Sequence, residues 1–470
     1  NCTMPRPNIL FIMTDDHAAH AMSCYGSRIN QTPNLDRIAQ GGMLFNNCFC
    51  TNSLCEPSRA AILTGTYNHI NEVTTIGAHI DNRQENVAKI LQRNGYQTAI
   101  VGKWHLGQGP AHWPTGFDYW NILQGQGPYF DPEMVCNGEK VQYEGYTTDL
   151  ITDLSLEWLK ERDKEKPFFM MYHHKAPHRP WDPDDKHADM YEDIDIPTPD
   201  TFDDDYSNRA AAAGAAQMTV AEHLTERDLK QPVPQGLTPA EEKHWKYQRY
   251  IKDYLRCVAS VDDNVGRVLD YLDDEGIADD TLVIYTSDQG FFLGDHGWYD
   301  KRFMYEESLR MPFIIRHPRS IAPESVNNDI ITNVDFAATF LDYAGIDQPD
   351  RFQGRSFRPL LEGSTPEDWP EIMYYRYWMH LAHHHVYAHY GVRTHRYKLI
   401  YYYADALGQP GAIDESKPPE WELFDLDEDP NELNNVYHDP AYADIAAELR
   451  GELRRLQEEV QDAPYPAEQP

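Results

Sequence analysis

Short apolar runs alternate with longer amphipathic stretches along most of the chain. Five runs rich in β-branched and aromatic residues predict strands, at residues 8–13, 98–101, 168–172, 282–286 and 313–316. The stretches between several of them carry helical periodicity, and this alternation is typical of a largely parallel sheet covered by helices. We therefore predict an α/β fold built on one large, mixed but mostly parallel sheet flanked by helices.

The clearest helix begins after Thr238. Pro239 suits the first helical position and Glu241 stands three residues after Thr238, as in a capping box. Apolar residues then recur every three or four positions from Tyr247 to Leu272, and Gly276 marks the end. A last helix is predicted near the C-terminus, with one apolar face formed by Ile445, Leu449, Leu453, Leu456 and Val460.

The composition of the chain changes twice. Residues 181–236 contain an acidic run and an alanine-rich stretch, which predicts an insertion over the sheet. After residue 363 the chain becomes rich in tyrosine and histidine, and residues 391–403 alternate like antiparallel strands. We predict an N-terminal α/β domain at 1–363 and a C-terminal subdomain at 364–470, formed by an antiparallel sheet and a helix.

Charge excludes two classes of partner. The 470 residues include 41 Lys and Arg against 76 Asp and Glu, a formal net charge of −35. A nucleic-acid binder or a polybasic membrane-surface protein needs the opposite balance. No apolar run approaches the ~20 residues of a membrane span, so we expect no membrane insertion.

The first residues and the number of cysteines indicate where in the cell the protein is expected and whether it contains disulfide bonds. If a leader has been removed before Asn1, a periplasmic or secreted protein is expected, whereas a natural start at Met4 predicts a cytoplasmic one. Seven cysteines are few for this length and odd in number, so a disulfide scaffold is not expected, although one or two bridges remain compatible with the count.

Two predicted strands end in oxygen donors. Asp15 and Asp16 follow the first strand, and Asp288 and Gln289 follow the strand at 282–286. Either pair alone is compatible with a solvated turn. Together they favour a cation site, because ligands collect at the carboxyl ends of strands and adjacent carboxylates repel unless they are paired. Oxygen ligands favour Ca²⁺ or Mg²⁺ over Zn²⁺.

Cys55 stands just ahead of a predicted short helix. Pro57 suits its first position and Gly65 its end. The helix dipole favours an anion or an activated nucleophile there, and Arg59 adds a positive charge one turn later. A buried, unreactive cysteine is the alternative.

These segments resemble the type I sulfatases, the formylglycine-dependent members of the alkaline-phosphatase superfamily. Their C-x-P-S-R signature matches Cys55-Glu56-Pro57-Ser58-Arg59, and a second signature matches residues 95–105 (GYQTAIVGKWH). The resemblance runs nearly end to end, because further matches follow in the family's order at Asp15-Asp16, Asp288, Lys301, Tyr305-Glu306, Arg310-Met311-Pro312 and residues 422–430.

The resemblance implies a fold, a nucleophile and a metal. The fold is alkaline-phosphatase-like, with residues 1–363 as the catalytic domain. A formylglycine-generating maturation enzyme would oxidise Cys55 to Cα-formylglycine, whose hydrate attacks sulfur with one hydroxyl and expels sulfate with the other. An unconverted chain is therefore expected to be nearly inactive. A divalent ion, Ca²⁺ rather than Mg²⁺, would be held by Asp15, Asp16, residue 55, Asp288 and Gln289.

The resemblance also implies roles for basic residues that, taken singly, would read as structural. Arg59 and Lys103 would fix the aldehyde hydrate and neutralise charge on sulfate. His105 would orient the hydrate or assist its elimination. His178 and Lys301 would bind sulfate oxygens and protonate the leaving alcohol.

Two residues depart from the family's pattern. The position after the cysteine is more often small, and Glu56 occupies it here. The last metal ligand is commonly Asn, and Gln289 replaces it with a carbonyl oxygen on a longer stem. We expect conversion of Cys55 and metal binding to survive both changes.

A histidine-rich segment invites a zinc interpretation. If His383, His384 and His385 lay in a strand, they would point to alternate faces and would not chelate one ion. A structural or substrate-binding role is therefore preferred. The C-terminal subdomain resembles that of carbohydrate-acting sulfatases, in which it contributes to the substrate pocket, so His384, His389 and Arg393 are predicted to bind substrate. His296, in residues 293–297, resembles a further residue near the site and is also predicted to bind substrate.

The leading hypothesis is an arylsulfatase-type hydrolase of O-sulfate esters on carbohydrates. The segment 289–301 resembles that of hexosamine and algal-polysaccharide sulfatases, which implies a substrate of one of these classes. The alternatives are a phosphodiester or phosphonate monoester hydrolase of the same superfamily, or a catalytically silent sulfoglycan-binding protein. Since the substrate is an anion and the chain carries −35, attraction must come from a local positive pocket inside an acidic shell.

Overall fold

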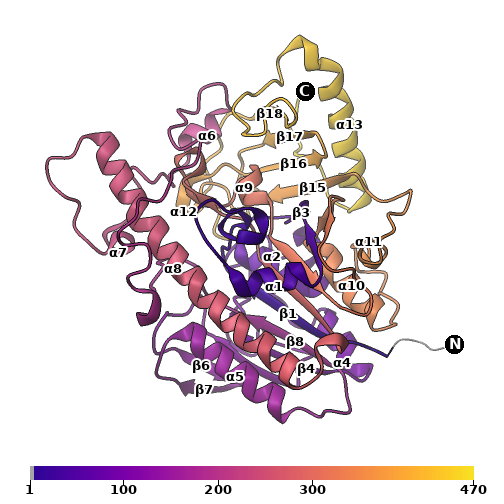
Figure 1. The fold of residues 1–470 in the computed structure, drawn as a ribbon. Coiled ribbons are helices and arrows are strands. Elements are labelled where there is room, and N and C mark those ends of the chain that lie inside the picture. Colours follow the sequence, from indigo (N-terminus) through magenta and orange to yellow (C-terminus); the bar gives the residue numbers. More distant parts are fainter. Residues whose placement is uncertain (1–4) are drawn as a thin grey trace.

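A ten-stranded sheet with helices on both faces forms the body of the molecule (Figure 1). The computed structural model describes residues 5–470. All five predicted strands lie in this sheet, and five strands run parallel at its centre, from β9 to β5. The predicted α/β fold is therefore confirmed. In spatial order the strands are β13 (Ser325–Asn327), β2 (Met43–Phe45), β12 (Phe313–Arg316), β9 (Thr281–Ser287), β1 (Asn8–Thr14), β8 (Phe168–His173), β4 (Gln97–Gly102), β5 (Tyr119–Leu123), β6 (Glu133–Cys136) and β7 (Glu139–Gln142).

Two helical layers bury the central strands. In one layer α8 (Pro239–Asp274) contacts α1 (Pro33–Gln40) and α5 (Thr147–Glu161). In the other α10 (Phe336–Tyr343) contacts α2 (Cys55–Thr64) and α4 (Val87–Arg93). Strand β8 touches both layers, because successive side chains point to opposite faces: Phe169 packs against Phe340 of α10, and the Tyr172 hydroxyl bonds to Thr152 of α5. The shorter helices are α3 (Asn68–Asn71), α6 (Ala211–Ala215), α7 (Glu226–Leu229), α9 (Glu306–Leu309), α11 (Arg358–Leu361) and α12 (Ala382–His385).

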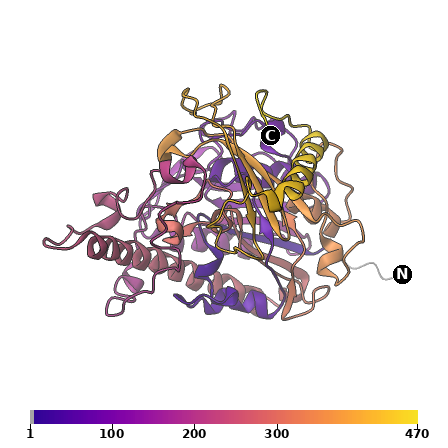
Figure 2. The same ribbon diagram turned by 90° about the horizontal axis from the view of Figure 1, so that it is seen from above.

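The long helix α8 begins and ends as its sequence predicts. The Thr238 hydroxyl accepts the Glu241 N–H and the Glu241 carboxylate accepts the Thr238 N–H, which completes the capping box. After Asp274 the chain turns at Gly276, whose φ of 74° is left-handed. The N-terminal part of α8 projects to the left, away from the sheet (Figures 1 and 2). Across residues 5–470 no helix combines the length and the apolar character that a membrane span requires.

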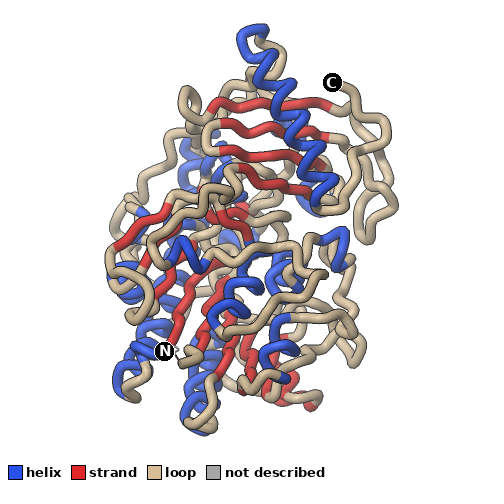
Figure 3. The backbone as a smooth tube through the Cα atoms, turned by 90° about the vertical axis from the view of Figure 1, so that its right-hand side faces the viewer, coloured by secondary structure: helices blue, strands red, loops and turns tan. Residues whose placement is uncertain are grey.

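A second, antiparallel sheet lies above the first. Its strands run in sequence order, β15 (Ile372–Tyr377), β16 (His389–Thr394), β17 (Tyr397–Tyr402) and β18 (Glu420–Asp425), so the predicted alternation at 391–403 is the β16–β17 hairpin. Helix α13 (Ala443–Glu459) crosses one face of this sheet (Figure 3) and buries Leu449 and Leu453 against it. The domain boundary at 363 and the insertion at 181–236 stay predictions.

Two short ribbons and the cysteines complete the fold. β10 (Phe292–Leu293) pairs with β11 (Tyr299–Asp300), and β3 (Cys48–Phe49) pairs with β14 (Ile331–Thr332). The six cysteines of residues 5–470 are all free thiols, and Cys2 lies outside the described residues.

Candidate active site

Neighbouring parallel strands bring the predicted metal ligands to one edge of the sheet. β1 ends just before Asp15 and Asp16, and β9 ends just before Asp288 and Gln289. The last residues of the two strands, Thr14 and Ser287, are partners in register, so both pairs lie side by side. All four of these side chains are buried.

The next two strands add the basic residues. His178 follows β8, and Lys103 and His105 follow β4. Gly102 pairs with His173 in register, and the Lys103 N–H donates to the His173 carbonyl at 3.1 Å. Four consecutive parallel strands therefore end around one point, which is where α/β sheets place their ligands.

Cys55 opens helix α2 against this edge. The helix begins at Cys55, two residues earlier than Pro57 suggests, and Pro57 lies in the first turn, where its missing N–H needs no intrahelical partner. Gly65 ends the helix with a φ of 63°, as predicted. Burial raises the pKa of the Cys55 thiol to about 11, despite the opposing charge of Lys301, so an unmodified thiol stays protonated at neutral pH.

Three cations and three carboxylates meet in the site. Arg59 donates through Nε (3.3 Å) and Nη2 (3.2 Å) to Asp288 Oδ2, and through Nη1 to the Lys103 carbonyl (3.0 Å). The Lys301 Nζ donates to Asp16 Oδ1 at 2.6 Å. The Lys103 Nζ contacts Asp15 Oδ2. When all six groups are ionised, the three positive and three negative charges cancel.

The oxygen donors of the site fit a cation. Asp15 Oδ1 and Gln289 Oε1 are buried without a hydrogen-bond partner. Asp15, Asp16 and His178 offer ligand atoms that lie within 4.8 Å of one another. Burial raises the pKa of Asp16 to about 7, and the charge of Asp288 adds to this against the opposing Lys301. A bound cation would relieve that cost and would leave the site net positive.

Two predicted histidines lie at the same edge. The His178 Nε2 is 3.9 Å from Asp15 Oδ2 and 3.8 Å from Asp16 Oδ2. His105 is half-buried, with a positive φ of 50° and no hydrogen-bond partner at Nδ1. Burial and the Lys103 charge hold the pKa of both imidazoles well below the usual range.

The predicted substrate residues make contacts within the protein. His296 is buried and its Nδ1 lies 2.7 Å from Asp204 Oδ2. The ring of His389 packs among tyrosines, and its Nδ1 donates to the Tyr387 carbonyl. The His384 Nε2 lies 3.2 Å from Asp300 Oδ2, and Asp300 directly precedes Lys301.

Arg393 forms an ion pair, whereas the consecutive histidines 383–385 lie in a short helix. Arg393 pairs with Glu306 in the C-terminal half. The assumption that His383–His385 lie in a strand is wrong: they belong to α12, where His383 and His385 both have a positive φ of 57°. The substrate-binding roles of His296, His384, His389 and Arg393 stay predictions.

The C-terminal sheet holds the loop before Cys55, a contact that sequence reasoning missed. The Tyr375 hydroxyl accepts the Ser53 N–H at 3.0 Å and donates to the Arg302 carbonyl at 2.6 Å. Next to it, the Arg376 N–H donates to the Thr51 carbonyl. The run IMYYRY at 372–377 was the available signal, since its tyrosines alternate between the two faces of β15.

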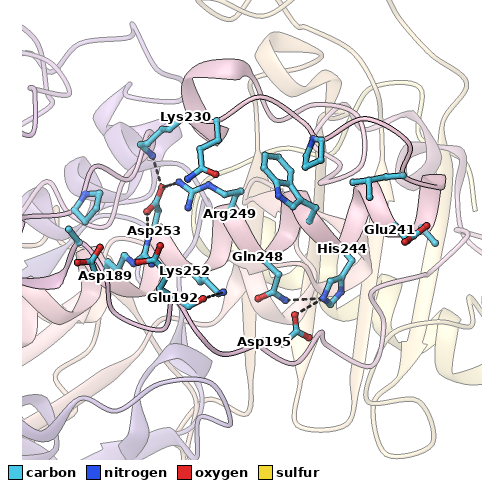
Figure 4. Close-up of a pocket in the computed structure, with 18 residues that line it drawn as sticks. Asp189, Glu192, Asp195, Lys230, Glu241, His244, Gln248, Arg249, Lys252 and Asp253 are labelled. Atoms are coloured by element: carbon cyan, nitrogen blue, oxygen red, sulfur yellow. Dashed lines mark hydrogen bonds and ion pairs between the residues drawn. The ribbon is translucent and has the colours of Figure 1, made fainter.

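A network on α8 anchors the loop that carries His178. Asp253 binds Lys230, Arg249 and Arg256, and Lys230 also donates to the Pro180 and Trp181 carbonyls. This network borders an open groove of about 940 Å³ along α8 (Figure 4), which contains none of the predicted catalytic residues. Its cations Lys230, Arg249, Lys252 and Arg256 bind groups within the protein, so the candidate site remains the one at the sheet edge.

Comparison with known proteins identifies the family. The family model for sulfatases matches residues 7–346, and that for the C-terminal part of N-sulphoglucosamine sulphohydrolase matches residues 294–459. An N-acetylglucosamine-6-O-sulfatase from Bacteroides thetaiotaomicron is 44% identical over 97% of this chain and 87% of its own length. A solved structure in complex with its substrate D-glucosamine-2-N,6-O-disulfate is 43% identical, with a TM-score of 0.92 over 97% of this chain and 98% of the other. A phosphonate monoester hydrolase from Silicibacter pomeroyi shares the fold, at 23% identity and a TM-score of 0.77 over 97% and 96% of the two chains. The chain therefore belongs to the sulfatase family, the sulfuric ester hydrolases of the alkaline-phosphatase-like superfamily.

Proposed function

We propose that the chain removes the 6-O-sulfate of glucosamine-type sugars, with residue 55 as Cα-formylglycine and a bound Ca²⁺ ion. The observation that carries the proposal is the convergence of buried oxygen donors and buried cations on Cys55 at one sheet edge. The substrate class is supported by the N-acetylglucosamine-6-O-sulfatase that is 44% identical over nearly the whole chain.

The metal would be held by oxygen atoms from the two strand ends and from residue 55. Asp15, Asp16, Asp288 and Gln289 supply these oxygens, and the buried, unpartnered atoms of Asp15 and Gln289 support this assignment. When bound, a divalent ion supplies Lewis-acid polarisation of a sulfate oxygen and lowers the pKa of a coordinated hydroxyl.

The remaining chemistry belongs to the chain's own groups. One hydroxyl of the residue 55 hydrate gives its proton to a carboxylate of the site as it attacks sulfur, the S–O bond to the sugar breaks, and the sugar oxygen takes a proton from the charged Lys301, while His178 binds a sulfate oxygen. The other hydroxyl then gives its proton to the neutral His105 and re-forms the C=O bond, the C–O bond to sulfate breaks, and water restores the hydrate. Arg59 and Lys103 neutralise charge on the sulfate, and burial strengthens this effect.

A substrate panel tests the proposal. The matured enzyme should release sulfate from N-acetylglucosamine-6-sulfate and from 4-nitrophenyl sulfate, and should prefer the 6-sulfate over the 3-sulfate isomer. Cys55→Ala should lose at least about 10³-fold in kcat, because it removes the nucleophile. EDTA should abolish turnover and Ca²⁺ should restore it. A higher kcat/KM for a phosphodiester or a phosphonate monoester would overturn the choice of reaction. Turnover that survives complete chelation would overturn the metal.

A further inference from the structure

Glu56, the residue that departs from the sulfatase signature, is part of a buried contact beside the nucleophile. Its side chain is 1% exposed and lies in the first turn of α2. Oε2 accepts the Gly77 N–H at 3.0 Å, and Oε1 lies 2.7 Å from His79 Nδ1. Both carboxylate oxygens are therefore used to hold one loop, residues 77–79, against the nucleophile helix.

That loop lies directly against the segment that carries His105. The Ile80 N–H donates to the Leu106 carbonyl at 3.0 Å. Gly107 packs so closely on His79 that a Cβ built at Gly107 would lie 2.8 Å from the Cβ of His79. His79 therefore lies beside residues 106 and 107, which directly follow His105.

One ring nitrogen of His79 is bound to Glu56, and the other has no hydrogen-bond partner among the described residues. Its side chain is 45% exposed, although the carboxylate that it contacts is buried. Its Nε2 has no hydrogen-bond partner among the described residues, whereas Nδ1 is fixed by Glu56. Because Nδ1 donates to the Glu56 carboxylate, the other ring nitrogen, Nε2, is the acceptor in this tautomer.

We propose that His79, positioned by Glu56, determines specificity by accepting a hydrogen bond from a hydroxyl or amide N–H of the sugar that bears the sulfate. The inference rests on the proposed function, since it assumes a sugar in the pocket. His79 acts on the leaving group's ring and leaves the chemistry at sulfur to the residues at the sheet edge. Glu56 is a positioning residue that sets the orientation and tautomer of the ring.

The test compares a sugar substrate with one that lacks a sugar. kcat and KM are measured for N-acetylglucosamine-6-sulfate and 4-nitrophenyl sulfate, per formylglycine-containing molecule as counted by peptide mass. His79→Ala should lower kcat/KM for the sugar about tenfold or more and change the aryl sulfate rate by less than about twofold. Glu56→Gln should raise KM for the sugar and preserve kcat. His79→Gln, which keeps an acceptor, should recover part of the sugar rate.

His244→Ala is the matched control. His244 also pairs with a carboxylate, Asp195, at 2.8 Å and is 43% exposed, but it lies on α8 in the groove of Figure 4. It should change neither substrate's kinetics. Equal losses on both substrates in His79→Ala, or no loss on the sugar, would overturn the inference. A wild-type enzyme that cleaves only the aryl sulfate would instead overturn the proposed function.

Discussion

Replacing Tyr375 by Phe tests whether the C-terminal sheet positions the nucleophile. The Tyr375 side chain is fully buried, and its hydroxyl joins the Ser53 N–H to the Arg302 carbonyl. Phe keeps the ring but leaves both backbone groups buried without a partner. Each such loss costs about 1–2 kcal/mol, so the variant should lose about 2–4 kcal/mol in the free energy of unfolding.

The same substitution should also slow catalysis. Ser53 lies two residues before Cys55, and Arg302 follows Lys301, so the hydroxyl joins two segments that carry proposed catalytic residues. A displacement of about 1 Å at the nucleophile can cost about 10²-fold, and we expect kcat on 4-nitrophenyl sulfate to fall about 10- to 100-fold.

Tyr374→Phe supplies the control. Tyr374 is equally buried on the opposite face of β15, where its hydroxyl binds Asp462 and Gln457. Both variants should unfold at lower temperature in calorimetry, but only Tyr375→Phe should lose kcat per formylglycine-containing molecule. Equal kcat values in the two variants would refute the positioning argument, because stability alone would then explain the contact.

Three further predictions concern the ion pair between Arg179 and Asp228, the pH dependence of stability and the salt dependence of turnover. Arg179 donates to Asp228 through Nε at 2.8 Å and Nη2 at 2.5 Å. Asp228→Asn should weaken this ion pair, make the position of the neighbouring His178 less fixed and lower kcat about tenfold. An unchanged kcat would show that the ion pair does not position His178. Burial raises the pKa of Glu422 from 4.5 to about 7, so the folded chain keeps a proton that the unfolded chain releases, and stability falls as pH rises between these values. Glu422→Gln should therefore raise the unfolding temperature above pH 7 and leave it unchanged below pH 4.5, whereas an equal gain at both would contradict this cause. Turnover of a polysulfated substrate should hold or rise between about 50 and about 200 mM salt, because salt screens the outer charge of −35; a steep fall with the fold intact would contradict this.

Local patterns in the sequence were sufficient for the central fold. Strands β1, β8 and β9 are buried on both faces and read as continuous apolar runs, so their existence does not depend on which neighbours they find. The capping box of α8 is equally local, because its two hydrogen bonds join Thr238 and Glu241. The acidic residues at the ends of β1 and β9 could also be predicted locally, because they directly follow these two apolar runs in the sequence.

The edge strands of the large sheet could not be predicted from local patterns. β13 is short and its Val326 is 61% exposed, and β7 carries exposed Glu139 and Lys140. Such segments become strands only when a neighbour offers its backbone groups, so their pairing belongs to the assembled sheet. The order of the ten strands, which brings Asp288 beside Asp15, is likewise a long-range property.

The family, the candidate nucleophile and the candidate metal ligands were thus predicted from the sequence itself, through residue types at short spacings. The tertiary structure decided how these groups are held and what surrounds them. It placed Tyr375 of a distant strand on the loop before Cys55, and it paired Glu56 with an exposed His79. It also turned His296 towards Asp204 and away from solvent. The physical reason is that each of these contacts joins residues far apart in the chain or across separate loops, and no periodicity or spacing in the sequence records which side chains meet once the core has closed.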